Sequence, residues 1–342
     1  MKRVLILSVL LITQVYLFAQ SLTVDIIASG TNTNLRGLSV VNDNIIWVSG
    51  SNGTVGKSSN GGKNWKWMTV KGFEKKDFRD IEAFDANTAI IMAIQEPAYI
   101  LKTTDGGETW KVVYENKTKG MFLDAMDFAT PQYGVVVGDP INGNVFLAET
   151  NDGGNSWTEI YNKQQRLAVD SGEAFFAASG SNIRLYNTKD IFIVSGGTKS
   201  RFIVNDKLTP LPLLQGKETT GANAIDIFDD GIPNKPGKRM IVVGGDFADP
   251  KSTEKNCFIS TDRGKTWKAP KTAPKGYRSC VEFLSKNDVL TCGLNGVDYS
   301  RDGGKNWNAV STESFNVCRI ARIGTSVFLA GSNGRIGRFV SR

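Results

Sequence analysis

The sequence contains no histidine in its 342 residues. Catalysis by a Ser-His-Asp triad is therefore excluded, and so is any zinc site that needs an imidazole ligand. The four cysteines are widely spaced and include no Cys-x-x-Cys pair, which argues against a cysteine-only metal site. No glycine-rich dinucleotide fingerprint precedes a helix either. We therefore expect neither a metal nor another cofactor.

The cysteines leave two alternatives open. In an oxidising compartment one disulfide is plausible, and Cys280 and Cys292 would be near neighbours across a hairpin. Buried free thiols are the other alternative. Four cysteines allow three complete pairings, and the sequence does not select among Cys257, Cys280, Cys292 and Cys318.

A dense basic stripe is also missing. The formal net charge of +7 is a modest excess for a chain of this size, and the basic residues are scattered along it. Nucleic-acid binding usually needs clustered positive charge with aromatic side chains for stacking. We therefore expect a solvated surface and no nucleic-acid partner.

Long apolar runs are absent after residue 20, but the N-terminus has the layout of a secretory signal peptide. Lys2 and Arg3 precede an apolar stretch that ends at Phe18, and the small Ala19 precedes Gln20. The apolar stretch is short for a membrane span, and no cysteine marks a lipid anchor. The sequence therefore predicts a signal peptide over residues 1–19, export to the periplasm or medium, and no membrane span afterwards.

One eight-residue pattern occurs five times. Ser or Thr is followed by Asp or Asn two residues later, by Gly four later and by Trp seven later. The short acidic or amide side chain can accept backbone N–H groups in a turn, Gly supplies a positive φ, and Trp starts the next strand. We expect these positions to be structural: Asn60, Trp65, Asp105, Trp110, Asp152, Trp157, Asp262, Trp267, Asp302 and Trp307.

The spacing of the repeat predicts a β-propeller. The Trp residues of successive patterns are 45, 47, 110 and 40 positions apart, so one blade lacks the pattern, and residues 190–197 and 200–205 have the right strand character for it. Periods of this length with four strands each are typical of propeller blades. Seven segments read as innermost strands: 35–41, 78–84, 122–128, 172–179, 221–228, 277–284 and 315–323.

We therefore predict an all-β fold, a single seven-bladed propeller over residues 20–342 with four-stranded antiparallel blades. The last repeat stops before its fourth strand, whereas residues 22–27 have no blade of their own. Pairing of this N-terminal strand with the last blade would close the ring and remove two exposed edges.

Charged residues on the innermost strands are the candidate binding residues, because these strands line the channel. The alternation of side chains prevents Arg79 and Asp80 from both facing inward. The simpler explanation is a wet channel of mutually neutralising ion pairs, and the functional alternative is a site for an anion or a glycan. The candidates are Arg79, Asp80, Asp124, Glu173, Arg278 and Arg319, with loops at 162–170, 229–237 and 247–254 near the entrance.

The repeats resemble the Asp-box, or bacterial neuraminidase repeat, of sialidases and other propellers, where it lies on the blade rim away from the ligand. The Arg-Ile-Pro motif of sialidases is missing, and sialidases have six blades, so that resemblance ends at the repeat. Carboxylates for another glycosidase could come from Asp80, Asp124 and Glu173.

Export, seven blades and boxes of the form Asp-Gly-Gly-x-x-Trp together resemble the photosystem II stability and assembly factor-like family. The resemblance implies a propeller that binds protein partners, membrane-associated ones included, with an arginine-rich patch on its surface. We therefore expect a non-enzymatic binding or assembly protein. A glycan-binding or glycoside-hydrolase-like protein is the alternative, and an oxidoreductase is a remote one.

Overall fold

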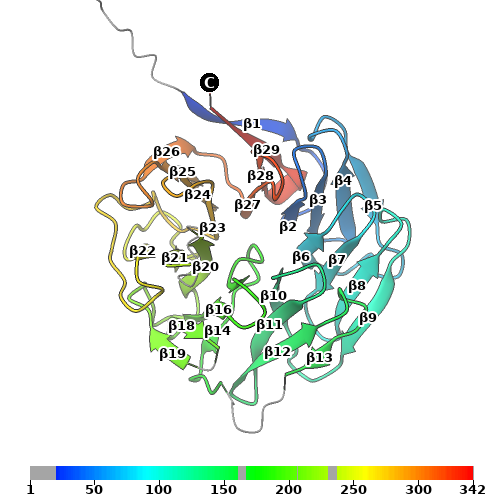
Figure 1. The fold of residues 1–342 in the computed structure, drawn as a ribbon, viewed down its shortest axis with the longest axis horizontal. Coiled ribbons are helices and arrows are strands. Elements are labelled where there is room, and N and C mark those ends of the chain that lie inside the picture. The colour runs from blue at the N-terminus through cyan, green and yellow to red at the C-terminus, as the bar shows by residue number, and fades with distance from the viewer. Residues whose placement is uncertain (1–20, 161–166, 206, 230–236, 342) are drawn as a thin grey trace, which may run out of the picture.

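The computed structural model describes residues 21–160, 167–205, 207–229 and 237–341. The predicted signal peptide and parts of two predicted loops, at 161–166 and 230–236, lie outside these residues. Seven β-sheets are arranged around a central channel, and the chain passes from one to the next around the ring, except for its N-terminal strand and two short edge strands (Figure 1). The prediction of a seven-bladed propeller is confirmed.

The first three blades each have four antiparallel strands in simple meander order. Their strands are β2 (Leu35–Val40), β3 (Ile46–Gly50), β4 (Thr54–Ser58) and β5 (Lys66–Thr69); β6 (Phe78–Ala83), β7 (Ala89–Ala93), β8 (Ala98–Thr103) and β9 (Lys111–Asn116); and β10 (Leu123–Phe128), β11 (Gly134–Ile141), β12 (Asn144–Thr150) and β13 (Thr158–Glu159).

The remaining blades vary more. They contain β15 (Ile183–Leu185), β16 (Ile191–Val194), β18 (Arg201–Val204) and β19 (Lys207–Pro210); β20 (Thr220–Phe228), β21 (Arg239–Asp246) and β22 (Cys257–Ser260); β23 (Cys280–Phe283), β24 (Val289–Gly293), β25 (Gly296–Ser300) and β26 (Asn308–Ser311); and β27 (Val317–Ile320), β28 (Val327–Ala330) and β29 (Ile336–Ser341). A short 3-10 turn, η1 (Ser332–Gly334), links the last two strands. In the fifth blade the fourth strand is reduced to one bridge between Ile259 and Lys268.

The ring is closed by the N-terminal strand, as the sequence predicts. Strand β1 (Leu22–Ala28) pairs antiparallel with β29, from Leu22 opposite Ser341 to Ala28 opposite Ile336. The two ends of the described chain thus share one sheet (Figure 1). Closure of this kind removes the free edges that an open ring would expose.

One predicted inner strand is wrong. Residues 172–179 form only the two-residue β14 (Glu173–Ala174), which pairs with β17 (Gly196–Gly197) at the edge of the fifth blade. The inner strand of the fourth blade is β15 instead. The apolar pair Phe175 and Phe176 gave this segment a strand-like composition, but it continues as a loop into the channel.

The core lies between neighbouring blades. Trp47 is fully buried and packs with Ile81 and Leu101 of the second blade, while Phe328 joins the last blade to Leu38 of the first. The second strands of the blades, such as β3, β7 and β24, are buried on both faces, which explains their continuous apolar character. Burial of this kind is the main favourable term in folding.

The Asp-boxes are turns between the third and fourth strands. In the fourth box the Gly264 N–H donates to Ser260 Oγ at 2.8 Å, and the Thr266 N–H donates to Asp262 Oδ1 at 2.9 Å. The Thr266 hydroxyl donates to the other carboxyl oxygen at 2.6 Å. These hydrogen bonds favour the ionised form, and the side chain of Thr266 is the main cause that lowers the pKa of Asp262 to about 2.

The glycine four residues after the Ser or Thr of each box allows close contact with the preceding blade. Gly264 has a φ of +75°, and a Cβ placed there would overlap the ring of Phe202 in the fourth blade. The equivalent glycines of the other boxes also have positive φ and lie against the blade before them: Gly62, Gly107, Gly154 and Gly304. The box therefore ties the blades together at the rim.

Candidate functional site

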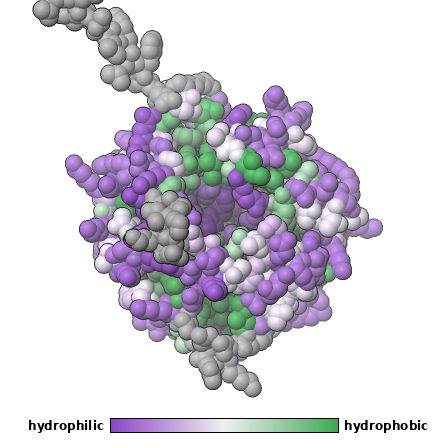
Figure 2. All heavy atoms as spheres, viewed as in Figure 1, coloured by the Kyte–Doolittle hydropathy of each residue, from purple (hydrophilic) through white to green (hydrophobic). Residues whose placement is uncertain are grey.

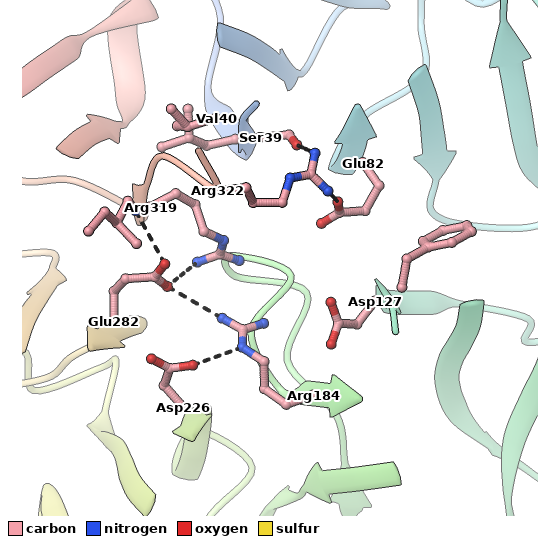
Figure 3. A pocket seen from close by; sticks show the side chains of 12 residues that line it. Ser39, Val40, Glu82, Asp127, Arg184, Asp226, Glu282, Arg319 and Arg322 are labelled. Carbon is pink, nitrogen blue, oxygen red and sulfur yellow. Dashed lines mark hydrogen bonds and ion pairs between the residues drawn. The ribbon is translucent and has the colours of Figure 1, made fainter. Parts of the chain in front are cut away.

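A ring of polar side chains surrounds a cavity of about 170 Å³ in the channel (Figure 3). Each blade contributes one equivalent position of its inner strand, opposite the same part of the second strand: Glu82 faces Ile90, Asp127 faces Val135, and Arg319 faces Phe328. Figure 2 shows a hollow with hydrophilic walls at the centre of the molecule. The ring comprises Ser39, Glu82, Asp127, Arg184, Asp226, Glu282 and Arg319, and Arg322 lies beside it.

The acidic residues of this channel ring bind the backbone of the next blade. An inner strand has a free edge, and its buried N–H groups need acceptors. The Leu185 N–H donates to Asp127 Oδ2 at 2.6 Å, and the Phe283 N–H donates to Asp226 Oδ2 at the same distance. Similar bonds join Ala83 N–H to Ser39 Oγ, Met126 N–H to Asp80 Oδ2, and Ile320 N–H to Glu282 Oε1.

The three arginines of the cavity are committed to acceptors within the chain. Arg184 pairs with Asp226 at 3.2 Å and with Glu282 at 3.7 Å. Arg319 pairs with Glu282 and donates to the carbonyls of Cys318 and Ser179. Arg322 pairs with Glu82 and donates to Ser39 and Ala83. The geometry therefore matches a network of neutralising ion pairs.

Burial raises the pKa of several carboxyl groups in and beside this ring. Burial and the negative charges of Asp127 and Asp80 raise the pKa of Glu82, whereas the positive charge of Arg322 lowers it. The net effect is a pKa of about 7. Burial raises the pKa of Glu282 to about 8, with Asp226 adding to the effect. Burial likewise raises the pKa of Asp80 to about 6. These groups therefore take up protons in the neutral range.

The raised pKa of Glu82 predicts a pH dependence of stability. A carboxyl group whose pKa rises from 4.5 to about 7 on folding stabilises the fold fully below pH 4.5, and this stability is lost as the pH rises through about 7. We expect Glu82→Gln to flatten this decline by up to about 3 kcal/mol. Thermal unfolding between pH 4 and 8 would measure it, with Glu108→Gln at an exposed position as the control. Equal slopes for Glu82→Gln and the wild type would contradict the assignment.

Residues 175–182 cross the channel as a buried segment, which we call the channel plug. In Figure 1 a green loop of the fourth blade reaches into the ring between β10 and β20. The Ser179 hydroxyl donates to the Ser279 carbonyl at 2.7 Å, and the Ile225 N–H donates to the Ser181 carbonyl at 2.9 Å. The plug thus separates the cavity from the other end of the channel.

Arg36 and Arg79 lie at that other end. Both are close to the start of their inner strands, whereas Ser39 and Glu82 of the ring are near the ends of the same strands. Burial lowers the pKa of Arg36, and the charge of Arg79 lowers it further, so the two guanidinium groups are neighbours. The Arg79 guanidinium donates from Nε to Asp77 at 2.8 Å and lies over the Phe122 ring at 5.7 Å.

Aromatic side chains extend this surface. Phe247, which is 40% exposed, contacts the rings of Phe176 and Tyr277 at centroid distances of 5.8 and 6.3 Å. Tyr277 is close enough to Arg36 for their charges to interact. We call the surface formed by Arg36, Arg79, Phe122, Phe176 and Phe247 the arginine end of the channel.

The six predicted binding residues do not form one site. Arg319 lies in the channel ring, whereas Arg79 lies at the arginine end. Asp80 is buried between them, because the register shift between Phe78 and Asp80 turns its side chain toward the next blade. The other three candidates are buried away from the cavity.

Each of these three has a different environment. Glu173 pairs with Arg201 at 3.2 Å and accepts the Ser195 hydroxyl at 2.5 Å. Arg278 forms a buried ion pair with Asp298. Asp124 is fully buried, and burial raises its pKa well above the usual range although backbone N–H groups of Ala177 and Asp139 lie close to its carboxyl group.

Of the ring residues, only Arg319 is among the six candidates predicted from the sequence, and Asp127 and Arg184 are the two charged members that the predicted inner strands did not single out. An alignment of the inner strands on their register would have identified Asp127, which follows Met126 as Glu82 follows Ile81. Arg184 was hidden by the wrong inner strand in the fourth blade. All four cysteines are buried free thiols, so of the two alternatives this structure shows free thiols and not a Cys280–Cys292 disulfide.

The described residues contain neither a metal-binding cluster nor a membrane-spanning helix. No group of Cys, Asp and Glu side chains there could hold a metal ion. None of the helices in the same residues has the length and apolar character to cross a membrane.

Comparisons with known proteins agree with the repeat and the fold. Residues 19–124 match the family described as photosynthesis system II assembly factor YCF48, and residues 258–269 match the BNR/Asp-box repeat. No curated protein matches the sequence. Similarity to solved structures is widespread, as expected for a common architecture.

Three solved structures illustrate the likeness. YCF48 bound to a D1 peptide is 17% identical with a TM-score of 0.65, over 93% of this chain and 97% of that one. YCF48 from Cyanidioschyzon merolae has the same identity and TM-score, over 93% and 98% of the two chains. A GH74 enzyme from Niastella koreensis is 15% identical with a TM-score of 0.60, over 92% of this chain and 53% of the enzyme. The chain is therefore an Asp-box β-propeller with a domain like that of the photosynthesis system II assembly factor YCF48.

Proposed function

We propose that the protein is an exported, non-enzymatic binding or assembly propeller that recognises a segment of a protein partner at the arginine end of its channel. The YCF48 structure with a bound D1 peptide supports a protein partner for a propeller of this kind. The signal-peptide pattern of residues 1–19 supports export. A partner in the periplasm or medium, free or at a membrane surface, is consistent with both.

The uncommitted hydrogen-bond donors of Arg36 and Arg79 carry this proposal. Arg36 makes one long hydrogen bond, from Nη1 to the Ala178 carbonyl at 3.4 Å, and its buried Nε has no partner in the described residues. Arg79 uses Nε for Asp77. The arginines of the cavity ring, in contrast, are occupied by acceptors of the chain. The arginine end therefore offers the free donors that an acidic group requires.

The side-chain composition of the arginine end also fits a protein interface. Arginine and aromatic residues dominate the binding energy of many interfaces. Phe122 holds the Arg79 guanidinium against its ring, which keeps the planar fork in one orientation. Phe247 leaves apolar area exposed beside the two arginines. An acidic side chain or a C-terminal carboxylate, flanked by apolar residues, is the matching feature of a partner.

We expect Arg79→Gln to weaken binding to acidic peptides by about 10-fold to 100-fold, because one charge-assisted hydrogen bond is worth about 1.5–3 kcal/mol. A panel of peptides with acidic, neutral and basic ends, with free or amidated C-termini, would be titrated by fluorescence anisotropy at low and high salt. Binding to the acidic peptides should weaken with salt. Arg338→Gln removes the same charge at an exposed position on β29 and is the matched control.

Two results would contradict this proposal. Equal affinities for acidic and basic peptides would exclude a site for a carboxylate. Unchanged affinity in Arg79→Gln and in Arg36→Gln, with normal binding of the acidic peptides, would place the site elsewhere on the propeller.

A further inference from the structure

Three of the four cysteines meet at the inner surface of the sixth and seventh blades. Cys280 is the first residue of β23, Cys292 lies opposite it in β24, and Cys318 lies in β27 of the next blade. All three are fully buried free thiols. The Sγ atoms of Cys280 and Cys318 are 3.7 Å apart, although the two residues belong to different sheets.

Hydrogen-bond donors converge on the sulfur of Cys280. Arg319 donates from Nη1 to Sγ at 3.0 Å, and the Cys318 N–H donates to it at 3.4 Å. The Ser181 hydroxyl of the channel plug lies at 3.3 Å. A positively charged guanidinium beside a buried sulfur stabilises the deprotonated form of that sulfur. This arrangement therefore favours a thiolate at Cys280.

The acidities of the thiols differ accordingly. Burial raises the pKa of Cys280, but hydrogen bonds from Cys292 and Cys318 and the charge of Arg319 outweigh it and hold that pKa well below its usual range. Burial raises the pKa of Cys318 well above it. Burial likewise raises the pKa of Cys257, which lies alone in the fifth blade. Burial also raises the pKa of Cys292, so the cluster contains one nucleophilic sulfur next to two protonated ones.

We propose that Cys280 and Cys318 are an oxidisable thiol pair that closes into a disulfide between the sixth and seventh blades on exposure to hydrogen peroxide. The Cys280 thiolate attacks one peroxide oxygen, the O–O bond breaks, and hydroxide leaves, which gives a sulfenic acid. The Cys318 sulfur then attacks Cys280 Sγ, its proton joins the departing hydroxide, and water leaves. Two thiols and one peroxide thus yield one disulfide and two waters, once the first hydroxide has taken a proton.

The cavity gives the oxidant a route to the pair. Arg319 lines the cavity and also contacts Cys280 Sγ, so only this side chain lies between the thiolate and the cavity. Hydrogen peroxide is a small, neutral molecule, and a cavity of about 170 Å³ accommodates it. Strand β23 pairs with β24 and β27 pairs with β28, but no backbone pairing joins β23 to β27. The disulfide would therefore replace a contact between two sulfur atoms with a covalent bond between two sheets.

Peptide mapping of the intact protein tests this proposal directly. Trypsin separates the four cysteines into different peptides, at residues 256–263, 279–286, 287–301 and 306–319. The folded protein would be treated with peroxide, alkylated, digested and analysed by mass spectrometry. We expect a cross-link between peptides 279–286 and 306–319 with the loss of two hydrogens, while Cys257 stays alkylated.

Variants supply the matched controls. The disulfide would close a loop of about 40 residues and should raise the thermal midpoint by about 5 °C. This rise should persist in Cys292→Ala and Cys257→Ala but be absent in Cys318→Ala. A cross-link of Cys280 to Cys292 instead, a sulfinic acid on Cys280 without a cross-link, or four alkylated cysteines after peroxide treatment would overturn the proposal. The mapping of the wild type needs no variant to fold.

Discussion

Replacing Asp298 with asparagine is expected to lower the free energy of unfolding by about 3–5 kcal/mol, because it leaves the buried Arg278 guanidinium without its counter-charge. The side chains of Arg278 and Asp298 are only 1% and 0% exposed. Arg278 donates from Nε to Asp298 Oδ2 at 2.8 Å and from Nη1 to Asn295 Oδ1 at 2.6 Å. Chemical denaturation monitored by tryptophan fluorescence would measure the loss.

The control for this prediction is an ion pair at the surface. Lys66 and Glu108 are paired, but their side chains are 49% and 63% exposed, so Glu108→Ala should cost less than about 1 kcal/mol. The double variant Arg278→Leu with Asp298→Leu should be more stable than Asp298→Asn, since it buries no unpaired charge. A loss of less than about 1 kcal/mol in Asp298→Asn would show that the pair is not enclosed in solution.

This buried pair shows why the sequence alone does not reveal the environment of Arg278. Arg278 is the second residue of its predicted inner strand, as Arg36 and Arg79 are of theirs. Its partner, Asp298, lies in β25 of the same blade, 20 residues later. Whether an arginine at the start of an inner strand faces the channel or its own blade depends on that distant partner. The sequence pattern and the alternation of side chains along a strand do not contain this information.

The fold was more predictable than the site, since its signals are local. The box around Asp262 and Trp267 encodes a turn and the start of a strand within eight residues, and five copies define the period. The fourth blade has no box, and there the sequence analysis chose residues 172–179 in place of β15. The channel plug has polar groups that are satisfied only by other blades, as in the bond from Ser179 to Ser279, so no local rule identifies it.

The channel ring was partly predictable. Glu282 and Asp226 were recognisable as charged residues on apolar strands, but their function in the structure is to accept N–H groups from the next blade. Seven sheets that meet at an axis leave seven inner edges, and a propeller can satisfy these edges only with side chains or water. Acidic residues at this ring therefore follow from the architecture, and they are not by themselves signs of catalysis.

Gly180 of the channel plug is the position where we expect a substitution to expel the plug from the channel. Its φ is +65°, and a Cβ there would overlap the carboxyl group of Asp80. Asp80 cannot move aside, because it is buried and accepts the Met126 N–H at 2.8 Å. We expect Gly180→Ala to cost about 3 kcal/mol or more, as the backbone strain adds to the overlap.

Gly120 separates the two causes of this loss. It has a φ of +81°, but nothing lies within 4 Å of a Cβ placed there, so Gly120→Ala should cost only the backbone strain of about 1 kcal/mol. Denaturation of both variants would measure the difference. Asp80→Ala should recover part of the loss in Gly180→Ala, since the overlap disappears while the positive φ remains. Equal losses in Gly120→Ala and Gly180→Ala would mean that the plug does not occupy the channel, and the cavity would then be open to the arginine end.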